Sequence, residues 1–280
     1  MRERFESSRR SFHVLGLLTV LAMVLAPLAK ASPDDPEKVV IKTIDPTRIT
    51  NQERPWAFTM DPSTPSAGVW SFGYALGLGS GISADRPLPV NMATSDGSNT
   101  FQVTYGITGG VAPFVTATFA DVGTSSASQN YELGALWQLT RPEAHFRMTF
   151  AGSGFHEGQT DDNGVRGVVA ASLDNGPIRV AGNFRADKVF ATGRDAVDLI
   201  ATVGALWKLG SSVRLGAEYV GQDLEEMTSA EAEAGSRHTV GPTLAFDLDG
   251  GRYQVAVGSG FGLNAASPRV IGRLALAFNY

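Results

Sequence analysis

The last eight residues, "RLALAFNY" (residues 273–280), alternate between large apolar side chains and small or polar ones. Successive side chains of a β-strand point to opposite sides, so this pattern predicts a strand with two different environments on its faces. The large apolar positions are Leu274, Leu276, Phe278 and Tyr280. Most domains end in a polar, frayed tail, whereas this chain ends on an aromatic residue. We therefore expect the terminal strand to have a role of its own.

The same alternation recurs upstream, in twelve stretches between residue 68 and the end, separated by turn residues. In the first stretch Trp70, Phe72 and Tyr74 share one face, and the other face is glycine, alanine and serine. No Asp, Glu, Lys or Arg falls on the apolar faces. A soluble β-sandwich would instead carry charge on its outer face. The pattern predicts an all-β, membrane-spanning, antiparallel up-and-down β-barrel of about twelve strands, with its apolar face toward lipid.

The links between the predicted strands support a membrane barrel. Short turns alternate with mostly longer loops, which is typical of outer-membrane barrels with periplasmic turns and outer loops. Aromatic residues gather at the strand ends next to the short turns, where amphipathic rings prefer the lipid headgroups. This expected aromatic girdle includes Trp70, Trp137, Trp207 and Tyr253.

The N-terminal part divides into two segments. Residues 1–31 have a basic start, an apolar run "VLGLLTVLAMVLA" and an Ala-Lys-Ala cleavage site, which predicts a signal peptide for export. Residues 32–67 are polar and rich in proline, which disfavours a long helix. Two interpretations of residues 32–67 stay open: a flexible periplasmic lead, or a plug inside the barrel formed by residues 68–280.

Composition narrows the functions to consider. The chain has 280 residues, a net charge of −5 and no cysteine, so disulfides and thiolate sites are excluded and nucleic-acid binding is not expected. No phosphate-binding loop or metal-binding histidine spacing occurs, and we expect no cofactor. His156, Asp161 and Asp162 could activate a water molecule, but such residues on a glycine-rich loop usually form a turn. The sequence therefore predicts that the protein is not an enzyme.

Taken together, residues 68–280 resemble the porin-like outer-membrane β-barrel proteins of Gram-negative bacteria. The resemblance is most specific at "RLALAFNY", which is similar to the C-terminal assembly signal of that class. It implies that the barrel-assembly machinery binds Leu274, Leu276, Phe278 and Tyr280, and that the mature protein lies in the outer membrane among its lipids.

The inner face of the predicted barrel carries more basic than acidic residues. The candidates for lining the lumen are Arg147, Arg166, Arg179, Arg185, Asp198, Arg214, Glu218 and Arg273, and the same face includes Glu132, Asp187, Lys208 and Arg269. In an open barrel these arginines would favour the passage of anions, which predicts a small-solute diffusion channel. In a closed barrel they would pair across strands, for example with Asp198, and the outer loops would bind ligands or surfaces.

Overall fold

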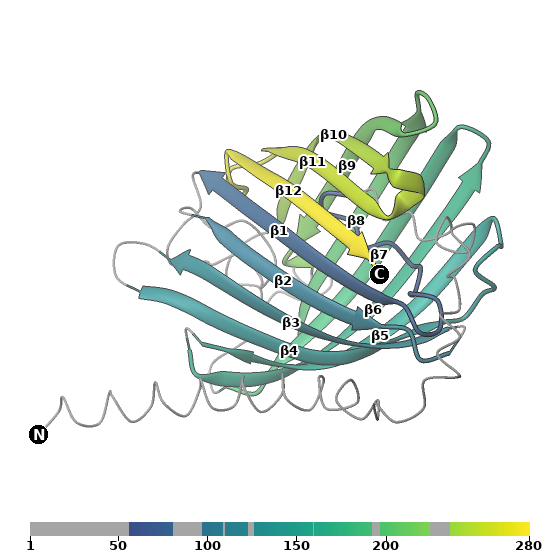
Figure 1. Ribbon diagram of the computed structural model, residues 1–280. Coiled ribbons are helices and arrows are strands. Elements are labelled where there is room, and N and C mark those ends of the chain that lie inside the picture. Colours follow the sequence, from purple (N-terminus) through teal and green to yellow (C-terminus); the bar gives the residue numbers. More distant parts are fainter. Residues whose placement is uncertain are drawn as a thin grey trace, which may run out of the picture. The chain divides into compact units, whose positions relative to one another are not determined.

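The computed structural model describes residues 56–80, 97–108, 110–122, 126–158, 160–191, 197–224 and 236–280. Twelve antiparallel strands form a closed barrel in which each strand pairs with its neighbours in sequence and β1 pairs with β12 (Figure 1). The prediction of a twelve-stranded up-and-down β-barrel is confirmed. The predicted signal peptide and residues 32–55 lie outside the described residues.

The strands are β1 (Trp70–Ser80), β2 (Ser98–Tyr105), β3 (Val111–Val122), β4 (Ser126–Gln138), β5 (Phe146–Glu157), β6 (Asp162–Asn175), β7 (Ile178–Val189), β8 (Asp198–Lys208), β9 (Val213–Gln222), β10 (Arg237–Leu248), β11 (Tyr253–Gly262) and β12 (Val270–Asn279). A single turn of 3-10 helix, η3 (Asp249–Gly251), links β10 to β11. Nowhere in the described ranges is there a helix long and apolar enough to cross a membrane.

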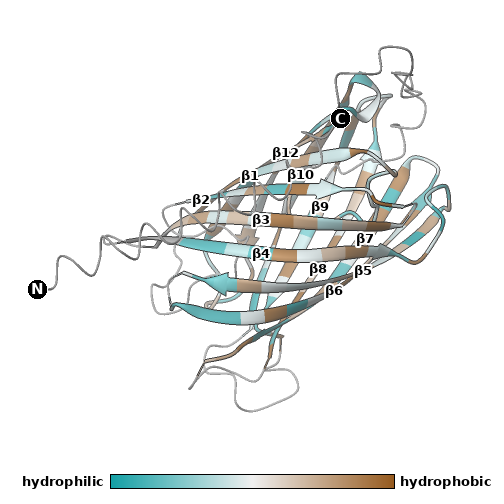
Figure 2. Ribbon diagram, turned by 60° about the horizontal axis from the view of Figure 1, so that its bottom comes forward, coloured by the Kyte–Doolittle hydropathy of each residue, from teal (hydrophilic) through white to brown (hydrophobic). Residues whose placement is uncertain are grey.

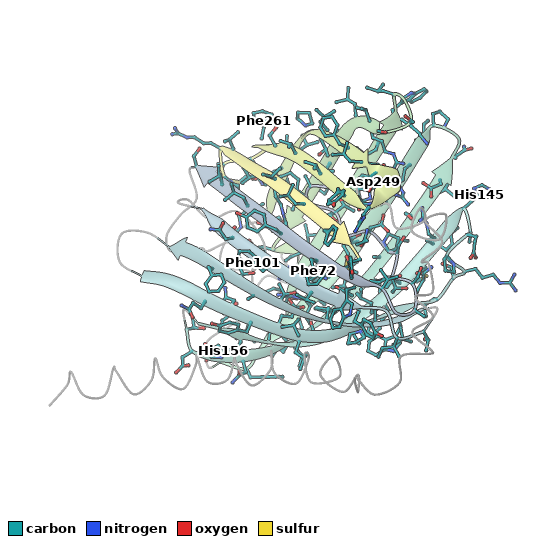
Figure 3. All side chains as sticks on the ribbon, in the orientation of Figure 1. Phe72, Phe101, His145, His156, Asp249 and Phe261 are labelled. Atoms are coloured by element: carbon teal, nitrogen blue, oxygen red, sulfur yellow. The ribbon has the colours of Figure 1, made fainter. Side chains whose placement is uncertain are left out.

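Large apolar side chains point outward from the barrel. Phe72 is 42% exposed, Leu133 63% and Val203 50%, whereas the residues between them in each strand are mostly buried. The labelled Phe72, Phe101 and Phe261 mark this outer surface in Figure 3. In Figure 2, β4 and β6 have hydrophilic residues at a strand end and become more hydrophobic along their length. This inverted arrangement, apolar outside and polar inside, suits a lipid solvent rather than water.

The first and last strands close the barrel. The backbones of Trp70 and Tyr280 exchange two hydrogen bonds, each with an N···O distance of 2.8 Å. Phe278 on β12 stacks against Phe72 on β1 and against Tyr253 on β11, with centroid distances of 6.3 and 5.2 Å. The terminal aromatic residues therefore belong to the seam that removes the free sheet edges.

Residues 56–65, which we call the inner segment, lie inside the barrel, immediately before β1 in sequence (Figure 1). They contact strand positions near the rim where the chain ends, such as Gln138 on β4 and Arg147 on β5, and deeper positions such as Glu218 on β9. All ten residues are buried or partly buried. The barrel interior is therefore partly filled by the protein's own chain.

Candidate functional site: the barrel interior

Glu218 holds the first half of the inner segment. Its carboxylate accepts hydrogen bonds from the backbone N–H groups of Ala57, Phe58 and Thr59, at 2.8, 2.9 and 2.6 Å. The hydroxyl of Thr243 on β10 donates a fourth hydrogen bond at 2.7 Å. Glu218 is only 2% exposed, so these four donors replace the water that a buried carboxylate would otherwise require.

Side chains near the rim hold the second half of the segment. Arg179 on β7 forms an ion pair with Asp61, with an N···O distance of 3.3 Å. Arg147 donates to the hydroxyl of Ser63 at 3.2 Å, and Gln138 accepts from both the N–H and the hydroxyl of Thr64. The hydroxyl of Thr149 donates to the carbonyl oxygen of Pro62. The inner segment is therefore fixed through polar groups on β4, β5, β7 and β9.

Apolar side chains of the barrel wall also pack against the inner segment. Trp56 packs with Leu206, Phe58 lies against a cluster of Ile200, Val220 and Ile271, and Met60 lies against a cluster that includes Leu136. A Cβ atom added at Gly204 would lie 2.3 Å from the Trp56 ring, and one added at Gly258 would lie 2.6 Å from the Cβ of Ala57. These two glycines leave the space that the segment occupies.

The apolar residues on the inner face were not expected from the sequence, which predicted a small and polar lining. Ile200, Val220 and Ile271 each follow an outward apolar residue, so the strict alternation is broken at these positions. This break in the alternation was the sequence signal from which apolar residues on the inner face could have been predicted. Leu136 and Leu206 also point inward, and both come from the similar stretches "GALWQL" and "GALWKL" at residues 134–139 and 204–209.

Most inner arginines take part in ion pairs. Arg166 pairs with Asp187 at 2.9 Å and with Glu132, and Arg185 also pairs with Asp187. Nearer the rim the ion pairs join Arg147 and Arg179 to Asp174, and Arg214 to Asp247. The interior therefore contains acidic partners, Asp174 and Asp247, that the predicted set of lumen residues did not include.

The structure places the predicted lumen residues as follows. Arg147, Arg166, Arg179, Arg214 and Glu218 are buried, and Arg185, Asp198 and Arg273 are partly buried. The remaining two basic residues of the expected inner face, Lys208 and Arg269, are instead exposed, at the end of β8 and just before β12. Both residues lie at strand ends, so their side chains are at the rims of the barrel and not in its interior.

The predicted girdle residues lie on the outer face, at the rim where the chain ends. Trp137, Trp207 and Tyr253 are 39%, 51% and 44% exposed, and Trp70, at the start of β1, is partly buried against Tyr105 with a centroid distance of 4.6 Å. Their role as membrane anchors stays a prediction.

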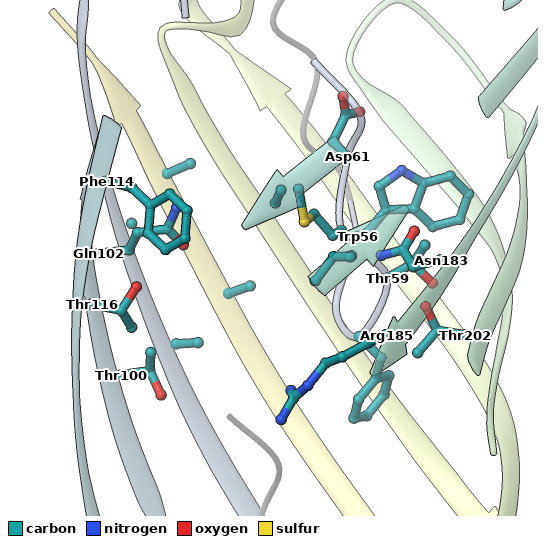
Figure 4. Close-up of a pocket in the computed structure, with 18 of the residues that line it drawn as sticks. Trp56, Thr59, Asp61, Thr100, Gln102, Phe114, Thr116, Asn183, Arg185 and Thr202 are labelled. Atoms are coloured by element: carbon teal, nitrogen blue, oxygen red, sulfur yellow. The ribbon is translucent and has the colours of Figure 1, made fainter. Parts of the chain in front are cut away.

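A cavity of about 270 Å³ lies between the inner segment and the barrel wall (Figure 4). Gly73, Ala75, Thr100 and Gln102 line it from β1 and β2, opposite the wall that binds the segment. Its charged lining residues are Asp61, Glu132, Arg166, Arg185 and Arg273. The cavity is therefore polar and charged on some sides, and basic residues exceed acidic ones by one.

Two of the three residues considered for catalysis, His156 and Asp161, lie close together near the end of β5, where Figure 3 labels His156. His156 Nε2 lies 3.8 Å from an Asp161 oxygen, and its Nδ1 lies 3.2 Å from Asn163. Asp161 itself occupies a turn with φ of 63°. Among the residues that the structure describes, no group of His, Cys, Asp and Glu could hold a metal ion.

The fold is similar to that of solved outer-membrane channels. The KdgM porin is 12% identical, with a TM-score of 0.51 over 75% of this chain and 99% of that chain. The COG4313 outer membrane channel from Pseudomonas putida F1 is 11% identical, with a TM-score of 0.55 over 78% and 97%. No protein-family model and no curated protein matches the sequence. The prediction of a porin-like outer-membrane β-barrel is confirmed for the fold.

Proposed function

We propose that this protein is an outer-membrane channel through which small solutes diffuse, and that the inner segment narrows the path as a plug. The observation that carries this proposal is a cavity of about 270 Å³ with charged and polar lining, inside a barrel whose outer face is apolar. The similarity in fold to a porin and to another outer-membrane channel supports it. Residues 1–31 would direct export, and the mature chain would begin near Ser32.

A second function is favoured by the filling of the interior. The inner segment and the ion pairs of Arg147, Arg166 and Arg179 occupy space that an open pore would leave to water. A barrel closed in this way would act as a structural or interaction protein whose outer loops bind ligands or surfaces.

Single-channel conductance separates the two functions. The chain from Ser32 is refolded, inserted into a planar bilayer and measured in a salt gradient. We expect steady conductance with a modest preference for anions, because three arginines and two acids line the cavity. Arg185→Gln with Arg273→Gln should reduce that preference. Arg141→Gln, at an exposed position in the link between β4 and β5, is the matched control. A folded barrel that conducts no ions would contradict the channel and support the closed barrel.

The plug has its own test. Deleting residues 56–65 should raise the conductance, because their contacts with Glu218 and Arg179 are lost and their volume returns to the lumen. Gly258→Leu should have a smaller effect in the same direction, since its side chain would meet Ala57 and Phe58. Gly73→Ala, at an inner position where an added Cβ meets its nearest atom at 3.6 Å, is the control. Unchanged conductance in both variants would contradict the plug.

A further inference from the structure

Arg252 lies in the turn between β10 and β11, which is fixed to the last strand. Its backbone N–H donates to the carbonyl oxygen of Asp249 at 3.2 Å, and its carbonyl oxygen accepts from the N–H of Asn279 at 3.0 Å. The side-chain amide of Asn279 also donates to the carbonyl oxygen of Gly251, at 3.2 Å. Figure 1 shows this turn at the same end of the barrel as the C-terminus. The position of Arg252 is therefore set by the end of β12.

The guanidinium group of Arg252 lies over three aromatic rings, which we call the aromatic platform. Its Cζ atom is 5.8 Å from the ring centre of Tyr253, 5.6 Å from that of Phe278 and 6.0 Å from that of Tyr280. Tyr253 and Tyr280 are 44% and 63% exposed on the outer face. A cation is attracted to the negative faces of aromatic rings. The platform therefore holds this guanidinium group on the outside of the barrel, at the level of the aromatic girdle.

Within the described part of the chain, Arg252 has no carboxylate partner. Its guanidinium group contacts the three rings of the platform. Asp249 is exposed in the same turn, and the hydrogen bond that joins it to Arg252 is between backbone groups (Figure 3). By contrast, the inner arginines Arg147 and Arg166 are paired with carboxylates. A guanidinium group presents five N–H donors in a planar fork that matches phosphate, so Arg252 is suited to an anion from outside the protein.

Apolar side chains continue from the aromatic platform toward the middle of the barrel wall. Val255 and Leu276 are the next cross-strand pair on the same face of β11 and β12, and Val257 follows on β11. Leu276 and Val257 are 38% and 47% exposed. Phe72, which stacks against Phe278, extends this surface onto β1. The cation therefore adjoins a hydrocarbon surface, which favours a ligand with acyl chains over a free phosphate ion.

The charge of Arg252 distinguishes between classes of phospholipid. The short turns at this rim predict that it lies at the periplasmic side of the membrane, where the aromatic rings are at headgroup level. In a zwitterionic phospholipid the phosphate already has the ammonium group of the same lipid as a partner. An anionic phospholipid has no such partner, and its net charge is complemented by a basic residue at the membrane surface.

We propose that Arg252 and the aromatic platform bind the phosphate group of an anionic phospholipid. The guanidinium group donates to the phosphate oxygens, and the acyl chains lie along Leu276 and Val257. The bound lipid then covers β11 and β12, next to the seam between β12 and β1. This inference does not depend on whether the barrel conducts solutes.

Binding is measured by native mass spectrometry on the refolded chain in a nonionic detergent. The probe is dioctanoyl phosphatidylglycerol, and dioctanoyl phosphatidylcholine is the zwitterionic comparison. We expect the wild type to bind the anionic lipid about fivefold more tightly, as for one basic residue at a membrane surface. Arg252→Gln should remove most of this preference, and Arg252→Lys, which keeps the charge, should retain most of it. Arg141→Gln removes an exposed arginine at the same rim and, as the matched control, should keep the preference.

Three results of the binding experiment would overturn the proposal. The first is equal binding of the two lipids to the wild type, which needs no variant. The second is an equal loss of preference in Arg252→Gln and Arg141→Gln, which would indicate a diffuse attraction by the charge of the rim. The third is displacement of the lipid by glycerol phosphate at equal concentration, which would indicate a phosphate site that does not use the acyl chains.

Thermal unfolding separates lipid binding from a purely structural role of Arg252. A ligand that binds only the folded barrel raises the unfolding temperature. Phosphatidylglycerol should therefore stabilise the wild type more than phosphatidylcholine does, and this difference should be lost in Arg252→Gln. The unfolding temperature is measured from the heat-dependent shift on a gel. If Arg252→Gln lowers it by the same amount in both lipids, Arg252 supports the seam alone and the lipid site is contradicted.

Discussion

Glu218 shows how backbone groups can accommodate a charge inside the barrel. Three backbone N–H groups and one hydroxyl surround its carboxylate, an arrangement that stabilises an anion and also orders the donors. The same side chain therefore serves two purposes, since it is satisfied by the inner segment and fixes the position of that segment.

We predict that Glu218→Gln loosens the inner segment. Glutamine has one acceptor oxygen in place of two and no charge, so at least one hydrogen bond worth about 1.5–3 kcal/mol is lost. Limited proteolysis of the refolded barrel should then cleave near residues 56–65 faster than in the wild type. Glu143→Gln, an identical change at an exposed turn, is the control. Equal cleavage rates in all three proteins would show that Glu218 does not hold the segment.

Val203 tests the orientation of the strands. It is half exposed in the middle of β8, where the chain is expected to face lipid. Val203→Arg should reduce the free energy of unfolding by about 2–4 kcal/mol if the position is at the bilayer midplane. Leu209→Arg, just beyond the end of β8, should cost only about 0–1 kcal/mol. Urea unfolding from lipid vesicles measures the free energy of unfolding of both variants. An equal loss of stability in Val203→Arg and Leu209→Arg would place Val203 away from the membrane centre.

Single side chains also explain what the sequence alone could and could not predict. Alternation assigned Phe72, Leu133 and Val203 to the outer face correctly, because each is flanked by small or polar neighbours. Ile200 and Val220 were harder to interpret, since both faces of their strands are apolar there. Such positions are explained only by a partner inside the barrel, which is Phe58 in this structure.

The last strand, β12, joins the terminal residues to β1. Deleting Tyr280 removes the two backbone hydrogen bonds with Trp70, and Phe278→Asp places a charge among the aromatic rings of Phe72 and Tyr253. We predict that both changes reduce the amount of folded barrel in the outer membrane of cells, measured by the heat-dependent gel shift.

Refolding of the same variants in detergent separates two causes. A variant that refolds in detergent but fails in cells has lost recognition by the assembly machinery. A variant that fails in both has lost the β1–β12 seam. Normal folding of both variants in cells would contradict the predicted assembly role of the terminal strand.

The inner segment marks the limit of prediction from local patterns. Its prolines and polar residues exclude a long helix but do not distinguish a flexible lead from a chain bound inside the barrel. The contacts that decide its position join Ala57, Phe58 and Thr59 to Glu218, across 159 to 161 residues. No periodicity in residues 56–65 encodes such distant partners.

The closed ring of strands predicts a uniform resistance to hydrogen exchange. Every strand has a neighbour on each side, so no row of backbone N–H groups is left at an edge. The amides of β1 and β12 should therefore exchange as slowly as those of β6 and β7. Exchange is measured by mass spectrometry on the refolded barrel in detergent, and faster exchange confined to β1 and β12 would show that the seam opens.

The architecture was predictable because one simple rule, alternation between lipid and interior, acts on all twelve strands. The interior site was only partly predictable. Strand phase assigned Arg185 and Arg273 to the inner face, yet their place in the lining of one cavity depends on strand order and closure. The acidic partners Asp174 and Asp247 lie close to strand ends. There the alternation of apolar and polar residues gives way to turn residues, so the sequence does not show which way these side chains point.

The position of the inner segment has a consequence for the order of folding. Trp56 packs near the end of β8 and Thr64 near the end of β4, so the segment enters and leaves the barrel by the same rim. It can dock after the ring has closed, without being threaded through it. The contacts with Glu218 and the β1–β12 pairs that close the ring both have very large sequence separation, so both should form late, because closing a long loop is entropically costly. Since the segment docks onto the inner wall, we expect the ring to close first and an empty barrel to precede the filled one.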